Sequence, residues 1–256
     1  MAASVTHLVV GEKILQQYYP DASVEVQGAF LAGCMLVDVH AFNPIDRRVT
    51  HFVGRVEEDG ESAYLQSCVY FLNHLDMLLC APWKELKPSG RSFAAGYLCH
   101  LAVDECWKKQ GALLFKKLGI QSWTDFPVPG DVGLTAFDFL SKDELMDAIA
   151  LDTLLAQITI PDVFTHVPGK MFVRQWEIIR NYVFMRGNPE AHFQMLELAG
   201  WSKQDIAFTR QKYHIFWEKS LTFMEQFVGV EPFLKEGIER SQQVMPRLFG
   251  HNFDHG

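Results

Sequence analysis

The segment from Phe93 to Trp107 reads FAAGYLCHLAVDECW, and most of its residues are apolar. An apolar run with helical spacing predicts a helix that is buried on nearly every side. Within it His100 and Asp104 stand four residues apart, so on a helix they share one face about one turn apart. An ionised aspartate in such surroundings is costly unless it is paired or bound to a metal. The spacing therefore leaves two interpretations open, a hydrogen-bonded His–Asp pair in the core and two ligands of a metal ion.

Helical periodicity continues on both sides of this segment, and strand signals are sparse. Ser92 is a good N-cap, Ser141 to Glu144 (SKDE) has the pattern of a capping box, and Asn188 precedes a proline at a first helical position. The expected helices span residues 6–19, 27–38, 62–80, 92–110, 141–158, 170–185, 202–227 and 232–248, with a further helix starting at 189. The only strand signals are Val24, Val26 and the stretch 49–56. The sequence predicts an all-α fold.

The length of 256 residues is near the upper limit for one hydrophobic core. We therefore expect residues 1–256 to form a single helical domain. The proline- and glycine-rich stretch 123–133 is the best internal linker, and it divides two halves that both need a partner to cover their apolar faces.

Charge and composition restrict the partners of the chain. The net charge is −8 and no Lys/Arg cluster interrupts it, which argues against nucleic acid and against anionic membranes. The N-terminus lacks the basic region of a signal peptide, and no apolar stretch approaches the length of about 20 residues that spans a bilayer. The five cysteines form no CxxC pair and lie in apolar sequence, so we expect buried, reduced thiols in a cytoplasmic protein without stable membrane insertion.

Two other segments carry residues of the same chemical types as the His100–Asp104 pair. Asp38 ends the apolar stretch GAFLAGCMLVD, and His51 follows it after a polar loop. His7 lies in the first turn of the first expected helix. Each residue alone is more often a capping or core residue than a ligand. Together, three imidazoles and two carboxylates form the ligand set that zinc and similar borderline metals prefer.

These segments, taken in order, resemble the zinc-dependent phospholipase C family, whose superfamily includes single-strand-specific nucleases. The resemblance covers about the first 110 residues: THL, then GAFLAGCMLVD, then RRVTHF, then FAAGYLCHLAVD. It implies a single multi-helix bundle of the phospholipase C type with two zinc ions. Asp104 would bridge the ions, Asp38, His51 and His100 would complete one site, and His7 would serve the other.

The chain also departs from the family pattern. Six residues precede His7, where secreted members use their N-terminal amine as a ligand, and no histidine follows Asp104 until His166. A divergent, unsecreted bacterial-type member is the nearest comparison, in which a similar D-x-x-W follows the helix.

Further ligands are expected from residues outside these segments. His214 and Glu218 form an HxxxE pair like that of another zinc site in the phospholipases, but a surface His–Glu pair is the favoured alternative. Asp152 lies in an apolar stretch and is another candidate ligand. His40 is two residues from Asp38 and is expected to support a ligand rather than bind metal itself.

The function implied is that of a metal-dependent hydrolase acting on a phosphoester or a phospholipid-like small molecule. Asp104 would bridge the ions and Asp38 is the candidate general base. Two alternatives remain open: a metalloenzyme of specialised metabolism using Fe or Mn, and a helical binding module with a structural metal. His7 at the surface and Asp38 paired with Arg47 would contradict both the family resemblance and the metal site.

Overall fold

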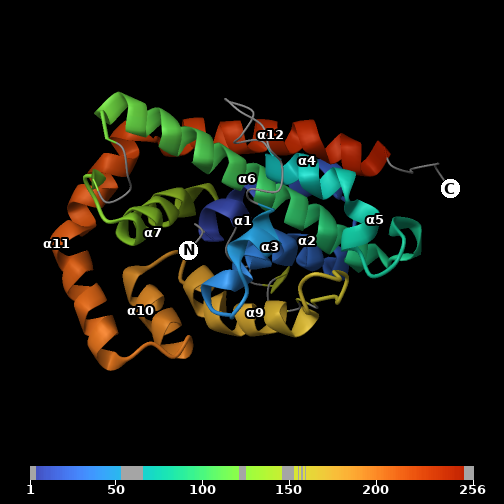
Figure 1. Ribbon diagram of the computed structural model, residues 1–256, viewed down its shortest axis with the longest axis horizontal. Helices are drawn as coiled ribbons and strands as arrows, with labels where there is room; N and C mark the ends of the chain where they lie inside the picture. Colours follow the sequence, from blue (N-terminus) through green and yellow to red (C-terminus); the bar gives the residue numbers. More distant parts are fainter. Residues whose placement is uncertain are drawn as a thin grey trace.

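The computed structural model describes residues 4–52, 66–120, 125–145, 153, 154, 156, 158 and 160–250 (Figure 1). Within these residues every regular secondary-structure element is a helix, and the only β-bridge joins Leu79 to Phe164. The predicted all-α class is confirmed for this part of the chain.

Three helices form the centre of the molecule. They are α6 (Pro88–Leu118), α2 (Val24–Leu36) and α1 (Ser4–Tyr18). The backbones of α2 and α6 touch, because a Cβ on Gly33 would lie 2.2 Å from the Phe93 carbonyl oxygen and one on Gly96 would lie 2.0 Å from the Phe30 carbonyl oxygen. Only glycine at both positions permits this contact, which brings the end of α2 close to the polar residues of α6.

The other helices cover this centre. In Figure 1, α12 (Val230–Gly250) runs beside α6, and α9 (Gly169–Phe184) lies on the opposite side, next to α2. At one end, α11 (Lys203–Phe227) packs on α7 (Gly130–Ser141), and α10 (Pro189–Leu198) packs on α9. The short elements are the 3-10 helices η1 (Val37–Ala41), η3 (Trp83–Glu85) and η5 (Lys142–Glu144) and the helices α3 (Arg47–His51), α4 (Gln66–Asn73) and α5 (Leu75–Leu78).

Most of the buried apolar side chains belong to one cluster, which extends from Val5 to Leu248. Residues 24–41, which include α2, are long and apolar enough to cross a membrane by length and composition alone. The expectation that no apolar stretch approaches the length that spans a bilayer was therefore wrong for these residues. Most of it is buried between helices, as expected of a core helix.

Two predicted helix starts are confirmed by hydrogen bonds. Asn188 caps α10 by accepting from the backbone N–H of Glu190, and Ser202 caps α11 by accepting from that of Asp205. The predicted helix 92–110 is real but begins earlier, at Pro88. Ser92 does not cap it, since its hydroxyl donates to the Val26 carbonyl on α2.

Other predictions of local structure were wrong. Ser141 ends α7 and donates to the Phe137 carbonyl, so SKDE is no capping box; most of the helix predicted to follow it lies outside the described residues. The valines at 24 and 26 are helical, because Ser23 caps a helix there by accepting from the backbone N–H of Val26, and this helix continues into the buried stretch from Gly28. Of the strand signal at 49–56, residues 49–51 belong to α3 and 53–56 lie outside the described part.

Two further boundaries differ from the predictions. The expected helix 62–80 is divided within its described part into α4 and α5, which are separated by His74. The linker at 123–133 is shorter than predicted, because α7 begins at Gly130. Four cysteines are buried as expected, but Cys80 is exposed; all five are free thiols.

Candidate metal centre

Four elements place the predicted ligands around one point. The α6 helix supplies His100 and Asp104, one turn apart and almost fully buried. His7 comes from the second turn of α1 and His51 from the last turn of α3, both fully buried. Asp38 lies in η1, where the backbone leaves helical geometry (φ −73°, ψ 30°) after α2.

The side-chain atoms of these five residues converge. His51 Nε2 lies 3.1 Å from Asp38 Oδ1 and 3.2 Å from Asp104 Oδ2. His7 Nε2 lies 3.4 Å from Asp104 Oδ1, so the two oxygens of Asp104 face two different histidines. His100 Nε2 is 3.9 Å from Asp38 Oδ2 and its ring stacks on that of His7. Segments up to 97 residues apart therefore meet at one buried cluster.

Two sets of three residues within this region could hold a metal ion. One contains His7, His100 and Asp104, and the other contains Asp38, His40 and His51; within each set the ligand atoms lie within 4.8 Å of one another. His40 was expected to act only as a supporting residue. Its Nδ1 lies 3.6 Å from Asp38 Oδ1, which makes it a candidate ligand.

Hydrogen bonds at the far side of two rings fix which nitrogen faces the cluster. His100 Nδ1 lies 2.8 Å from the Cys34 carbonyl oxygen, which only accepts, so Nδ1 carries a proton. His51 Nδ1 lies 2.7 Å from the Thr50 hydroxyl, which itself donates to the Arg47 carbonyl. Nδ1 of His51 is therefore also the donor. Both rings turn Nε2 toward the carboxylates, the arrangement found in metal-ligating histidines.

A positive charge is needed where these rings meet. The Nε2 atoms of His51 and His100 are 3.3 Å apart. Because His100 keeps its proton on Nδ1, its Nε2 presents a lone pair, and the contact is favourable only with a proton on His51 Nε2 or a cation nearby.

The pKa values describe the same balance of charges. Burial would raise the pKa of Asp38 and Asp104, but hydrogen bonds and charge from His51 outweigh burial and lower both, Asp104 well below its ordinary value. Burial lowers the pKa of His51, and the two carboxylates more than reverse this and raise it. Burial, with neighbouring positive charge, lowers the pKa of His100 to about 3. At neutral pH the cluster thus has two carboxylates and a neutral His100, the protonation states that metal ligands require, whereas the two carboxylates favour a protonated His51, which must release its Nε2 proton before that nitrogen binds a metal.

Arg47 is a member of this site that the sequence analysis did not identify. Its Nη2 lies 2.6 Å from Asp104 Oδ2, and about half of its side chain (49%) is exposed. Arg47 pairs with Asp104 and not with Asp38, the pairing that would have contradicted the metal site. The sequence contains one indication that Arg47 lies near the ligands, because Arg47 is four residues before His51 and the two share a face of a short helix.

The remaining predicted ligands lie elsewhere. His214 and Glu218 are exposed on α11 and belong to neither set of candidate ligands. Asp152 lies outside the described residues. Within the described part, the cluster is thus built by the first 104 residues alone.

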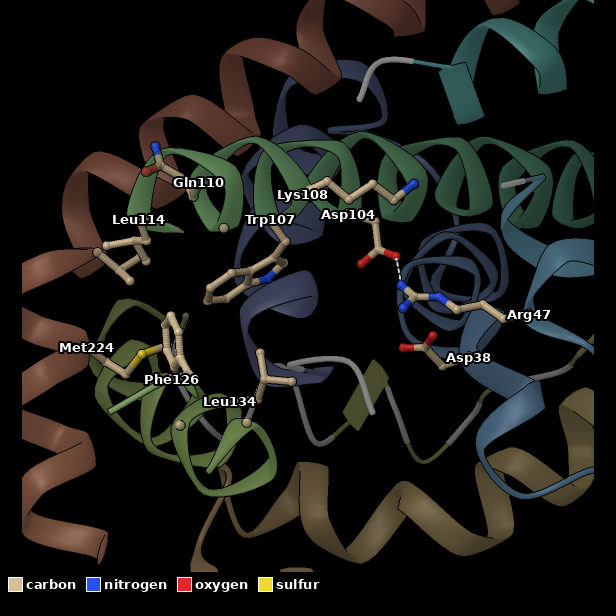
Figure 2. Close-up of a pocket in the computed structure, with 14 residues that line it drawn as sticks. Asp38, Arg47, Asp104, Trp107, Lys108, Gln110, Leu114, Phe126, Leu134 and Met224 are labelled. Carbon is tan, nitrogen blue, oxygen red and sulfur yellow. Dashed lines mark hydrogen bonds and ion pairs between the residues drawn. The ribbon is translucent and has the colours of Figure 1, made fainter. Parts of the chain in front are cut away.

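The cluster is open on one side. A pocket of about 360 Å³ is lined by Asp38, Arg47 and Asp104 and continues along α6 past Trp107 (Figure 2). A small molecule entering this pocket would reach both carboxylates.

Comparisons of the chain with protein-family models, with curated proteins and with solved structures find no match.

Proposed function

We propose that the protein is a metal-dependent hydrolase of phosphoesters, with a two-zinc centre of the zinc-dependent phospholipase C type. The observation that carries the proposal is the convergence of three imidazole Nε2 atoms and two ionised carboxylates beside an open pocket. The proposed ligands are His7, Asp38, His51, His100 and Asp104, with His40 as a sixth candidate.

The residues fit a cation for two reasons. Asp38 Oδ2 is buried and has no hydrogen-bond partner among the described residues, and a buried carboxylate oxygen left in this state is costly. The donors are imidazole nitrogens and carboxylate oxygens, the set that zinc favours and that iron and manganese also accept.

Asp104 is suited to bridge two ions. Its Oδ1 faces His7 of one candidate set, and its Oδ2 faces His51 of the other. A carboxylate with each oxygen directed to a different set of imidazoles lets two cations share one anionic residue.

The proposed reaction is hydrolysis of a phosphoester. Bound metal ions lower the pKa of water and neutralise charge on the phosphoryl oxygens. The water oxygen bonds to phosphorus while the bond from phosphorus to the alcohol oxygen breaks. Asp38, which lines the pocket, would accept the proton of the water, and the departing alcohol oxygen would take up a proton from solvent. Arg47 places a guanidinium beside the same carboxylates, where it pairs with a phosphoryl oxygen.

The test is metal content measured together with activity. Purified protein should carry between one and two equivalents of zinc, iron or manganese by elemental analysis. It should also hydrolyse p-nitrophenyl phosphate or its bis-ester, and lose that activity on chelation and regain it when zinc is added back. His100→Ala and Asp104→Ala should each lose metal from one or both sites, because each removes a ligand from the buried cluster.

His214→Ala is the matched control, since this exposed histidine of α11 lies in neither candidate set. Metal-free protein with unchanged thermal stability would contradict a metal centre. Loss of metal from His214→Ala as complete as from His100→Ala would show that the ligands were assigned wrongly. Bound redox-active iron without phosphatase activity would favour a different reaction.

A further inference from the structure

The pocket beside the metal centre changes character along its length. Asp38, Arg47 and Asp104 form one end, and Figure 2 shows Leu114, Phe126 and Met224 gathered at the other, with Trp107 between them. Leu134 and Val228 add to the apolar wall. A ligand that fills the pocket therefore needs a polar end and an apolar end.

One face of α6 forms a continuous wall of the pocket. Asp104, Trp107, Gly111 and Leu114 all line it, at spacings of three or four residues. Ten residues of helix separate the first from the last, which corresponds to about 15 Å at 1.5 Å per residue. The apolar part of the ligand is thus elongated and runs along α6, away from the carboxylates.

Two polar groups define what binds at the junction with the metal centre. Arg47 is half exposed and pairs with Asp104, so it can exchange that oxygen for one of an incoming anion. The indole Nε1 of Trp107 is buried and has no hydrogen-bond partner in the described part of the chain. It is a donor available to an ester oxygen. Lys108 also lines the pocket, but its Nζ donates to Ser67 Oγ, 3.1 Å away.

We infer that the substrate is an anionic ester with a single elongated apolar group, bound with its phosphoryl oxygens at Arg47 and the metal centre and its apolar group along α6. This inference rests on the proposed function. The volume of about 360 Å³ is at the small end of the range of about 300–1,000 Å³ for ligand pockets, so it fits one apolar chain rather than the two chains of a membrane phospholipid.

The test uses alkylphosphonates, whose C–P bond is not hydrolysed, with the zinc-loaded protein. Calorimetric titration should show that affinity rises from methyl- to butyl- to octylphosphonate, by up to roughly fourfold for each CH2 group that becomes buried. Arg47→Gln should weaken all three ligands by a similar factor.

Variants of the apolar end test the position of the chain. A Cβ at Gly130 would meet nothing within 4 Å, so Gly130→Leu adds a side chain to the pocket wall and should flatten the dependence on chain length. Leu134→Trp does the same from the next turn of α7. Ala207→Leu, on an exposed position of α11, is the control and should keep the wild-type dependence.

The outcomes separate this inference from the proposed function. One outcome is a protein that binds zinc and hydrolyses p-nitrophenyl phosphate, but whose affinity for alkylphosphonates does not change with chain length. That result overturns the inferred substrate class alone. A steep dependence in protein that takes up no metal overturns the hydrolase. Faster turnover of phosphatidylcholine vesicles than of soluble octyl phosphate would assign the pocket to a membrane lipid and overturn the single-chain ligand.

Discussion

At the scale of single residues, the hydrogen bond between Thr50 and His51 has the clearest expected effect. The Thr50 hydroxyl is buried, donates to Arg47 O and accepts from His51 Nδ1, which turns His51 Nε2 toward Asp38 and Asp104. Thr50→Val keeps the shape and removes this support, so zinc affinity should fall by roughly 10–100-fold. Titration against a competing chelator measures the change. Thr222→Val, in which an exposed hydroxyl of α11 is lost, should match wild type; equal affinity in both variants would show that Thr50 does not orient the ring.

The sequence predicted some residues of the cluster better than others. The spacing of His100 and Asp104 places them together on any helix, so their shared face needed no knowledge of the fold. The spacing of Arg47 and His51 indicates that they share a face, but the contacts of His40 with Asp38 and of Arg47 with Asp104 depend on how η1 and α3 fold back over α6. Exposure of His214 was likewise decided by which face of α11 packs on α7.

At the scale of helices, the contact between α2 and α6 determines the geometry of the site. Gly96→Ala would place a Cβ 2.0 Å from the Phe30 carbonyl oxygen, so the two helices must separate. We expect the free energy of unfolding to fall by about 1–3 kcal/mol or more, and zinc affinity to fall with it, because His100 moves away from Asp38. Urea denaturation measures the first effect. Gly130→Ala meets nothing within 4 Å and is the control; equal stability of the two variants would mean that the contact adapts.

Helix boundaries show where sequence patterns succeed and where they fail. Asn188 and Ser202 were predictable because each caps its own helix through a local hydrogen bond. Ser92 and Ser141 have the same residue type, but Ser92 bonds to another helix and Ser141 to the preceding turn of its own. A serine hydroxyl can thus cap its own helix, bond to a neighbouring helix or bond to the preceding turn, and the residue type alone does not decide which.

At the scale of the whole molecule, Asp138 joins three helices far apart in the sequence. From α7, its Oδ1 accepts from the backbone N–H and the hydroxyl of Thr6 on α1, each at 2.8 Å, and its Oδ2 accepts from the Tyr182 hydroxyl of α9 at 2.9 Å. Thr6 precedes His7, so this buried carboxyl also anchors the start of the helix that carries a proposed ligand. No sequence pattern indicated this role, because it requires residues 6, 138 and 182 to be brought together by folding.

The same residue gives the stability of the protein a specific dependence on pH. Burial, only partly offset by the hydrogen bonds from Thr6, raises the pKa of Asp138 from 3.8 to about 6. Well below pH 3.8 the group is protonated in both the folded and the unfolded chain. As the pH rises the unfolded chain loses this proton first, so the contribution of Asp138 to the free energy of unfolding falls, by up to about 3 kcal/mol, and levels off above pH 6. The lowered pKa values of Asp38 and Asp104 act in the opposite direction, since their contribution is lost as the pH falls.

The effect of Asp138 is isolated by the unfolding free energy of wild type minus that of Asp138→Asn. Urea titrations from pH 4 to 7 should show that this difference decreases as the pH rises, so that wild type loses stability relative to the variant. Asp143→Asn, at an exposed position, should track wild type throughout. A difference that is constant with pH would show that Asp138 is ionised equally in the folded and unfolded chains.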